Sequence, residues 1–318
     1  MATFTFRILV ILFVAGLLGA CAGTDHRNLE PFEENDGERL INSGDGEPGD
    51  HDGDADNDDG DQDSIDDGDN DHDGDGDSEE PLPNCRIVAN EEIKADEIPL
   101  QPGLGATYRV TLNQPFSTSG ELLDGDYLWD LSGDLPQDVD LLFETLPVTG
   151  QWFEEEFPDG TYAVRLSAAT DLLGVFQARS DALLLLGVVS PEDTGPFSRT
   201  RLIYDDPIKI LTLPLLFEDS WASESIVSGS AQGFSTAYTE RYSSEVDRRG
   251  VLKTPFGDFP VLRVRTELRR TSFGVTLATQ TTFAFVTPCF GTIATIVSTD
   301  GETGEDFQET SEIRRLAP

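Results

Sequence analysis

Histidine is scarce in this chain, and its placement excludes several kinds of active site. The sequence holds three histidines, His26, His51 and His72, and none follows residue 84. Residues 85–318 therefore cannot form a Ser-His-Asp triad, a Cys-His pair or a zinc site that depends on histidine. The G-x-S-x-G and phosphate-binding Gly-Lys-Thr motifs are also missing. Chemistry that uses only carboxylates needs no histidine and stays open.

Basic residues are few as well. The chain has 21 Lys and Arg against 61 Asp and Glu, which gives a formal net charge of −40. Residues 22–84 hold 25 of the acidic residues and only two basic ones, Arg27 and Arg39. Because a polyanion gains nothing by approaching another, nucleic acid is excluded as a partner, whereas cations or a basic partner are favoured.

Long hydrophobic runs are missing, and the longest one lies at the start. It extends from Ile8 to Leu18, and Arg7 is the only charged residue among the first 20. The run is too short to cross a bilayer as a mature helix and is typical of the apolar region of a signal peptide. We therefore expect residues 1–20 to be an export signal.

The end of this segment carries a specific motif. Leu18-Gly19-Ala20-Cys21 resembles the lipobox of bacterial lipoproteins, in which an aliphatic residue and two small residues precede the cysteine that receives the lipid. The resemblance implies that the thiol of Cys21 accepts diacylglycerol, that three acyl chains anchor the protein to a membrane, and that Ala22 directs it to the outer membrane. The alternative is an ordinary secretory signal with an incidental cysteine.

Residues 21–84 should form a lipidated tether. Between residues 45 and 80 there are 16 Asp and 3 Glu and no basic residue. Such a segment cannot offset its conformational entropy by apolar burial, so we expect a disordered spacer, extended by charge repulsion.

Part of the tether also resembles a calcium-binding EF-hand loop. Asp69, Asp71, Asp73 and Glu80 have the spacing of its ligands, and Gly74 stands at the turn. Gly76 replaces the usual aliphatic anchor, and no helices flank the loop. A plain solvated spacer, a defined calcium site and loose binding of cations therefore remain alternatives. No other cofactor is indicated.

Residues 85–318 hold nearly all the large apolar side chains and show period-two alternation, which predicts strands of an antiparallel sheet. In Val261–Arg269, Leu262, Val264, Thr266 and Leu268 alternate with charged residues, so we expect one buried and one wet face. A few helical turns are expected around Ser167–Gly174. The other expected strands are Thr107–Leu112, Leu141–Leu146, Thr161–Ser167, Ala182–Val189, Arg199–Tyr204, Ile208–Leu213, Thr236–Tyr242, Val275–Val286 and Gly291–Ser298.

The last third of the chain has a recognisable pattern of motifs. Gly250-Val251-Leu252-Lys253-Thr254-Pro255-Phe256-Gly257-Asp258-Phe259 leads into an alternating strand, and Gly291-Thr292-Ile293-Ala294 follows. Residues 205–298 resemble a broad group of exported bacterial β-proteins, which implies a strongly curved antiparallel sheet. We therefore predict a mainly β fold, half-barrel or sandwich-like, formed either by one domain over 85–318 or by two lobes, 85–204 and 205–318.

Cysteine is limited to Cys21 and two further residues, Cys85 and Cys289. Export places these two in an oxidising compartment, so one disulfide between them is expected. It would close a loop of about 200 residues, which corresponds to about 4–5 kcal/mol of stability in the chain-entropy model. The alternative is two independent buried thiols.

Two sets of side chains in residues 85–318 are candidates for binding. Aromatic residues could line an apolar ligand cavity on the concave face of the sheet or simply fill the core. A locally basic stretch could face an anionic ligand, receive the acidic tether, or form a wet sheet face balanced by acids. The aromatic candidates are Trp221, Phe273, Phe283, Phe285 and Phe290, and the basic residues are Arg248, Arg249, Lys253, Arg263, Arg265, Arg269 and Arg270.

Acidic residues gather at Glu154-Glu155-Glu156 and at Asp124 and Asp126, which is more typical of solvated surface than of catalysis. The sequence favours a non-catalytic binding or structural module of the cell envelope, with an unidentified partner there. The alternatives are a carrier of lipid or another hydrophobic ligand and, third, a hydrolase that uses carboxylates.

Overall fold

A computed structural model describes residues 85–87, 91–123, 125–193, 195, 199–302 and 304–318. These residues belong to one compact unit. The predicted export signal, the lipidation site Cys21, the acidic tether and the calcium residues Asp69, Asp71, Asp73 and Glu80 lie outside the described residues.

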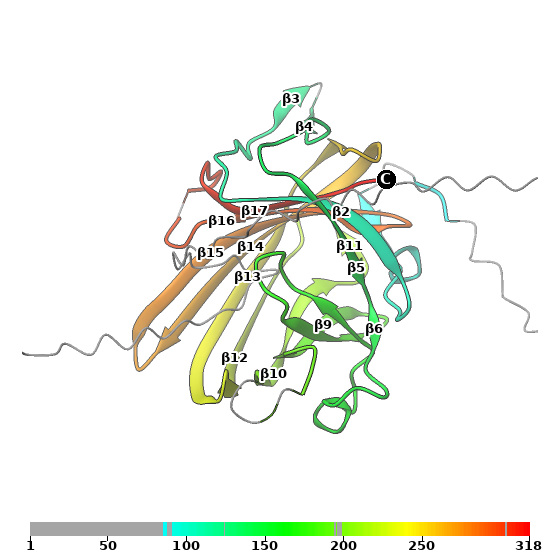
Figure 1. The fold of residues 1–318 in the computed structure, drawn as a ribbon. Helices are drawn as coiled ribbons and strands as arrows, with labels where there is room; N and C mark the ends of the chain where they lie inside the picture. The colour runs from blue at the N-terminus through cyan, green and yellow to red at the C-terminus, as the bar shows by residue number, and fades with distance from the viewer. Residues whose placement is uncertain (1–84, 88–90, 124, 194, 196–198, 303) are drawn as a thin grey trace, which may run out of the picture. The chain divides into compact units, whose positions relative to one another are not determined.

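The described chain is almost entirely β-structure (Figure 1), as the period-two alternation predicts. Two short 3-10 turns, η1 (Ala95–Glu97) and η2 (Glu154–Glu156), interrupt it. The strands are β1 (Glu92–Ile93), β2 (Gly105–Leu112), β3 (Glu121–Leu123), β4 (Asp126–Asp130), β5 (Val139–Glu144), β6 (Leu146–Pro147), β7 (Tyr162–Arg165), β8 (Leu173–Ala178), β9 (Ala182–Val189), β10 (Arg201–Thr212), β11 (Leu215–Leu216), β12 (Ser220–Ala231), β13 (Phe234–Lys253), β14 (Asp258–Ser272), β15 (Val275–Thr287), β16 (Gly291–Ser298) and β17 (Thr310–Leu316).

The main sheet has 15 strands and is curved until it is nearly closed. Its order is β5-β2-β17-β16-β15-β14-β13-β12-β10-β9-β8-β7-β6, with β3 and β4 attached beside β13. Neighbours along this path are antiparallel, and β4 pairs with β13 in parallel. The strands at the two ends of the order, β5 and β6, follow each other in the chain, and β5 contacts β7. The predicted curved antiparallel sheet is therefore confirmed.

Strands from residues 85–204 and 205–318 belong to this same sheet. β2 pairs with β17 at one side, and β9 pairs with β10 at the other. The sheet is therefore not divided at residue 204.

The inner face of the curved sheet is packed with side chains from both halves of the chain. Leu185 and Leu202 come from β9 and β10, while Val227, Val264 and Ala284 come from β12, β14 and β15. Alternation places these residues on one side because successive side chains of a strand point to opposite faces.

Two parts of the outer face are covered as well. Residues 113–138 lay Trp129 and Leu131 over β13 to β17, against Phe283 and Phe285. Residues 148–160, which include η2, lay Phe153 over β7 to β9. Strands β14 and β15 are therefore buried on both faces along much of their length.

The observed strands differ from the expected ones at several places. Ala182–Val189 and Gly291–Ser298 coincide with β9 and β16, and the two strands expected between Arg199 and Leu213 form the single strand β10. The expectation of helical turns around Ser167–Gly174 is wrong. A single tight turn at Ala168 and Ala169 is followed directly by β8. No expected range covers the longer strands β8, β12 and β17 or the short strands β1, β3, β4 and β11.

Candidate functional sites

The aromatic residues expected at a ligand cavity do not gather in one place. Phe283 and Phe285 are fully buried, with ring centroids 5.1 Å from those of Phe307 and Trp129 respectively. Phe273 is fully exposed in the turn between β14 and β15. Trp221 is half-buried, and its indole N–H donates to the carbonyl of Lys209 at 3.0 Å. Within the described residues these rings therefore fill core or face solvent.

Phe290, the remaining aromatic candidate, lies at the β15–β16 turn. Its ring centroid is 5.2 Å from that of Phe259. This contact places it against a second aromatic side chain and not across a cavity from the other candidates.

Two hollows on the surface of the sheet are open to solvent. One, of about 460 Å³, lies over β12, β13 and β14, and Trp221 is the only aromatic candidate among its lining residues, which are otherwise serines, Ala222, Glu245, Arg265 and Glu267. The other, of about 290 Å³, lies beside Arg249, Gly250 and Pro260. Neither has the enclosed apolar lining that a carrier of hydrophobic ligands requires.

A buried polar cluster lies on the inner face, among the apolar side chains. It consists of Tyr204 from β10, Tyr238, Glu240 and Tyr242 from β13, and Arg270 from β14, and we call it the Glu240 cluster. Each of these five side chains is at least nine-tenths buried. Alternation along β13 brings its three members to the same side.

Glu240 is held by four hydrogen bonds. The guanidinium of Arg270 donates to Oε1 from Nε at 2.8 Å and from Nη2 at 2.6 Å. The hydroxyls of Tyr204 and Tyr242 donate to Oε2 at 2.7 and 2.8 Å. Each of the two carboxylate oxygens already accepts two hydrogen bonds, so neither is available as a general base.

Burial dominates the electrostatics of the cluster. It raises the pKa of the Tyr204 and Tyr242 hydroxyls well above their ordinary value, and the Glu240 carboxylate raises each further. Burial alone would lower the pKa of Arg270, but the attraction of Glu240 outweighs it and the pKa is raised. Tyr238 lies under the guanidinium of Arg270, which is 4.7 Å from its ring centroid, and its buried hydroxyl has no hydrogen-bond partner among the described residues. The cluster is thus a neutral, tightly bonded unit.

The expectation that Arg263 faces water is wrong. Arg263 is fully buried, and it donates to Asp247 at 3.0 and 2.5 Å and to the carbonyl of Thr118 at 2.8 Å. Its guanidinium also lies 4.0 Å from the ring centroid of Phe283. Residues 113–138 cover the outer face here and exclude water from it. Through its hydrogen bond to Thr118, Arg263 connects this segment to the sheet.

Most of the other basic candidates are also used within the domain. Arg248 donates to Asp306 at 2.8 and 3.1 Å, and Arg265 pairs with Glu245 and Glu267. Arg249 pairs with acidic residues, and Arg270 belongs to the Glu240 cluster. An extended anion-binding face would need these charges free.

The acidic candidates are dispersed. Glu154 accepts the N–H of Gly150 at 2.8 Å, and Glu156 pairs with Arg201. Asp126 pairs with Arg249, 3.1 Å away, while Asp124 lies outside the described residues. In the part of the chain that the structure describes, no three His, Cys, Asp or Glu side chains are grouped so that they could hold a metal ion.

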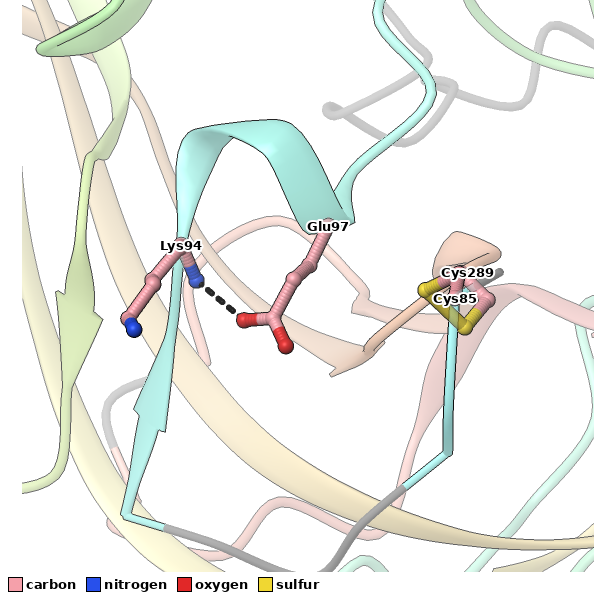
Figure 2. Close-up of a disulfide and its surroundings, with 4 residues drawn as sticks. All are labelled: Cys85, Lys94, Glu97 and Cys289. Carbon is pink, nitrogen blue, oxygen red and sulfur yellow. Dashed lines mark hydrogen bonds between the residues drawn. A yellow bond between two sulfur atoms is a disulfide. The ribbon is translucent and has the colours of Figure 1, made fainter. Parts of the chain in front are cut away.

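The expected disulfide between Cys85 and Cys289 is confirmed (Figure 2), with the two Cα atoms 5.6 Å apart. Cys289 also donates its N–H to the carbonyl of Glu97 at 2.7 Å, and the Glu97 carboxylate accepts the N–H of Lys94 at 2.7 Å. Residues 91–100, which we call the N-terminal strap, place Ile93 and Ile98 in the inner core. The disulfide therefore fixes the chain where the domain begins.

Comparison with protein-family models, with curated proteins and with solved structures finds no match for this chain. Among the described residues, no helix is long and apolar enough to span a membrane. The function must therefore be argued from the sequence motifs and from the geometry of the domain.

Proposed function

We propose that this chain is a lipid-anchored protein of the bacterial cell envelope, and that its β domain is a non-catalytic binding or structural module on an acidic spacer. The observation that carries the second part is the packed inner face. Side chains from both halves of the chain meet there, and the buried carboxylate of Glu240 is bonded to Arg270 and two tyrosines. A domain whose interior is filled in this way would bind a partner through its outer surface.

The first part of the proposal rests on the sequence. Leu18-Gly19-Ala20-Cys21 resembles a lipobox in the right context, after a single basic residue and an apolar run. Ala22 favours the outer membrane. The Asp-rich tether, which attracts cations, would act as a spacer between the anchor and the domain, and the disulfide at Cys85 gives the tether a firm point of attachment.

The two alternatives receive less support. A carrier needs an empty apolar cavity on the concave face, whereas that face is packed with side chains such as Leu185, Leu202 and Val264. A hydrolase that uses carboxylates needs two of them facing each other in a cleft about 5–10 Å apart. The acidic candidates Glu154, Glu156 and Asp126 are instead bonded to neighbouring groups on the surface.

Metabolic labelling with radioactive palmitate tests the proposal. We expect label on the wild-type chain and none on Cys21→Ala, because that thiol is the acceptor. Both should be exported, which separates lipidation from secretion. Absence of label on the wild type, or equal label on the variant, would overturn the proposed anchor.

A further inference from the structure

Two neighbouring hairpins end in exposed apolar side chains. Phe234 follows the β12–β13 turn and is 78% exposed, and Phe273, in the β14–β15 turn, is 103% exposed. Val275 and Leu277, at the start of β15, are exposed as well. Thr239 of β13 pairs with Thr271 of β14, so the two hairpins are neighbours in the sheet, and the β12–β13 end extends about three residues beyond the β14–β15 end (Figure 1). We call Phe234, Phe273, Val275 and Leu277 the apolar tip.

Phe273 gains nothing from its position within the domain. It has a φ of 48° and is followed by Gly274 at 78°, the two positive values that a two-residue hairpin turn requires. Asn, Asp or Gly normally occupies the first of these positions, because other side chains are disfavoured in this conformation. A fully exposed phenyl ring in a disfavoured backbone conformation points to a contact outside the chain.

Two unpaired cations lie behind the tip. Arg241 of β13 and Arg269 of β14 are cross-strand neighbours, and both are exposed. Among the described residues Arg241 has no ion-pair partner, although Glu224 lies opposite it on β12, and Arg269 donates only to the hydroxyl of Thr276 at 3.0 Å. This pairing of two arginines is unusual in so acidic a chain, because directly opposed like charges destabilise a sheet.

We propose that the apolar tip inserts into the interface of a lipid bilayer, with Arg241 and Arg269 at the level of the lipid phosphates. Arg269 lies four residues from Phe273, or about 13 Å along a strand, and Arg241 lies seven residues from Phe234, or about 23 Å, so the long arginine side chains must reach toward the tip. Rings at the acyl boundary and guanidinium groups among the phosphates are the arrangement that interfacial membrane segments adopt.

The shape of the tip favours a bilayer over a second copy of this chain. Two hairpin ends form a narrow projection, and such a projection buries little area against a folded protein surface, where stable interfaces need about 800 Å² from each partner. A fluid bilayer instead surrounds each ring on all sides. This step rests on the proposed function, because the tether would keep the domain within reach of a membrane.

Binding to lipid vesicles tests the inference without the anchor. The full chain carrying Cys21→Ala cannot receive a lipid, so any sedimentation with vesicles must come from the folded domain. We expect it to bind vesicles of phosphatidylcholine, whose headgroup offers a phosphate without net charge, because the chain's net charge of −40 opposes binding to anionic vesicles. Phe234→Ser with Phe273→Asn should lower binding by about tenfold or more for each ring. Leu142→Ser, at an apolar side chain on β5 that is 58% exposed, is the control and should bind as the parent does.

Phe273→Asn keeps the test independent of folding, because Asn is preferred in this turn and the variant should fold at least as well as the parent. Phe273→Trp adds a reporter whose emission should shift to the blue with vesicles and be quenched by brominated lipids. No sedimentation of the Cys21→Ala chain, or equal binding by the tip variants, would overturn the inference. If the tip substitutions abolish self-association of the chain and not vesicle binding, the inference is also overturned, and the tip is a contact between two copies. Failure of palmitate labelling, by contrast, would affect only the proposed anchor.

Discussion

At the scale of single residues, Glu240 and Arg270 occupy an environment that charged side chains rarely enter. Both are buried in the inner core, and each satisfies the other through two hydrogen bonds. Removing one partner leaves the other charge buried without compensation, which is far more costly than losing an exposed pair. The Glu240 cluster should therefore be sensitive to single substitutions.

Substituting Glu240→Gln removes the charge and changes the shape little. We expect the free energy of unfolding to fall by about 3–5 kcal/mol, because Arg270 then stays buried without a counter-charge. Denaturant unfolding followed by circular dichroism measures this. Glu267→Gln, at the exposed partner of Arg265, is the control and should cost less than about 1 kcal/mol. Equal effects of the two substitutions would contradict the account.

The buried tyrosines should make the domain sensitive to alkaline pH. Burial raises the pKa of each of them above the ordinary value of 10.0, so the folded state holds these protons more tightly than the unfolded state does. Their contribution to stability is complete below about pH 10 and is lost as the pH rises further. The residues concerned are Tyr108, Tyr162, Tyr204, Tyr238 and Tyr242.

We expect the ultraviolet absorbance of tyrosinate to appear together with the loss of circular dichroism during an alkaline titration, because most of these hydroxyls ionise only after unfolding. An absorbance change centred near pH 10, with the circular dichroism unchanged, would show that the side chains are accessible and would contradict the burial described above.

Part of this could be predicted from single residues. The period-two pattern that places Leu262, Val264 and Leu268 inward also places Arg270 inward if the strand is extended by one residue. Arg263 could not be assigned in this way, because alternation puts it on the outer face and only a segment distant in the sequence makes that face dry. Period-two alternation predicts which face of the sheet a side chain lies on. Whether another segment covers that face depends on the tertiary structure.

At the scale of elements, β4 is attached to the sheet through a close backbone approach. It pairs in parallel with the end of β13, where Gly250 lies opposite Tyr127. A β-carbon at Gly250 would overlap the carbonyl oxygen of Tyr127. The absence of a side chain at this residue is therefore what allows β4, and with it Trp129, to cover the outer face.

Substituting Gly250→Ala should displace β4 and cost on the order of 1–3 kcal/mol, as an overpacked contact does. A shift of tryptophan fluorescence to longer wavelength should accompany the loss, because Trp129 becomes exposed. Gly257→Ala, in the same hairpin, meets no atom closer than 3.9 Å and should change stability by less than about 0.5 kcal/mol. If the two variants behave alike, β4 is not positioned in this way.

Two of the strands missed from the sequence, β12 and β17, share a physical cause. β12 is rich in serine and weak in β propensity, and it forms because β10 and β13 flank it. β17 has only Ile313 and Leu316 as large apolar residues, and it carries Glu312, Arg314 and Arg315, whose burial is compensated by partners from elsewhere, such as Ser167 and Asp138. Local sequence patterns do not contain such partners.

At the scale of the whole molecule, the closure of the sheet depends on pairings between distant segments. β2 pairs with β17 across most of the domain, and the disulfide joins Cys85 to Cys289, 204 residues later. The resemblance of residues 205–298 to exported β-proteins implies the curvature, and the two cysteines predict the disulfide. The strand order cannot be derived from the sequence, because the long-range pairing of strands leaves no local signal. The apolar tip was also missed, since Phe273 was interpreted as a cavity residue.

Replacing both cysteines, by Cys85→Ser and Cys289→Ser, should lower the free energy of unfolding by about 5 kcal/mol in the chain-entropy model, for a loop of this length. Trypsin should also cleave faster at Lys94, because the N-terminal strap loses its covalent attachment. The wild type after reduction serves as the control and should behave like the double variant. Unchanged unfolding of the variant would mean that the strap is held by packing alone.

The central claim is that a lipid on Cys21 anchors a β domain whose interior is filled by its own side chains. Native mass spectrometry of the chain extracted from bacterial envelopes tests both parts at once. We predict a chain that begins at Cys21, carries acyl groups on that residue, retains the disulfide and releases no additional lipid on activation in the gas phase. An unmodified amino terminus, or a bound lipid that dissociates from the folded domain, would contradict the account.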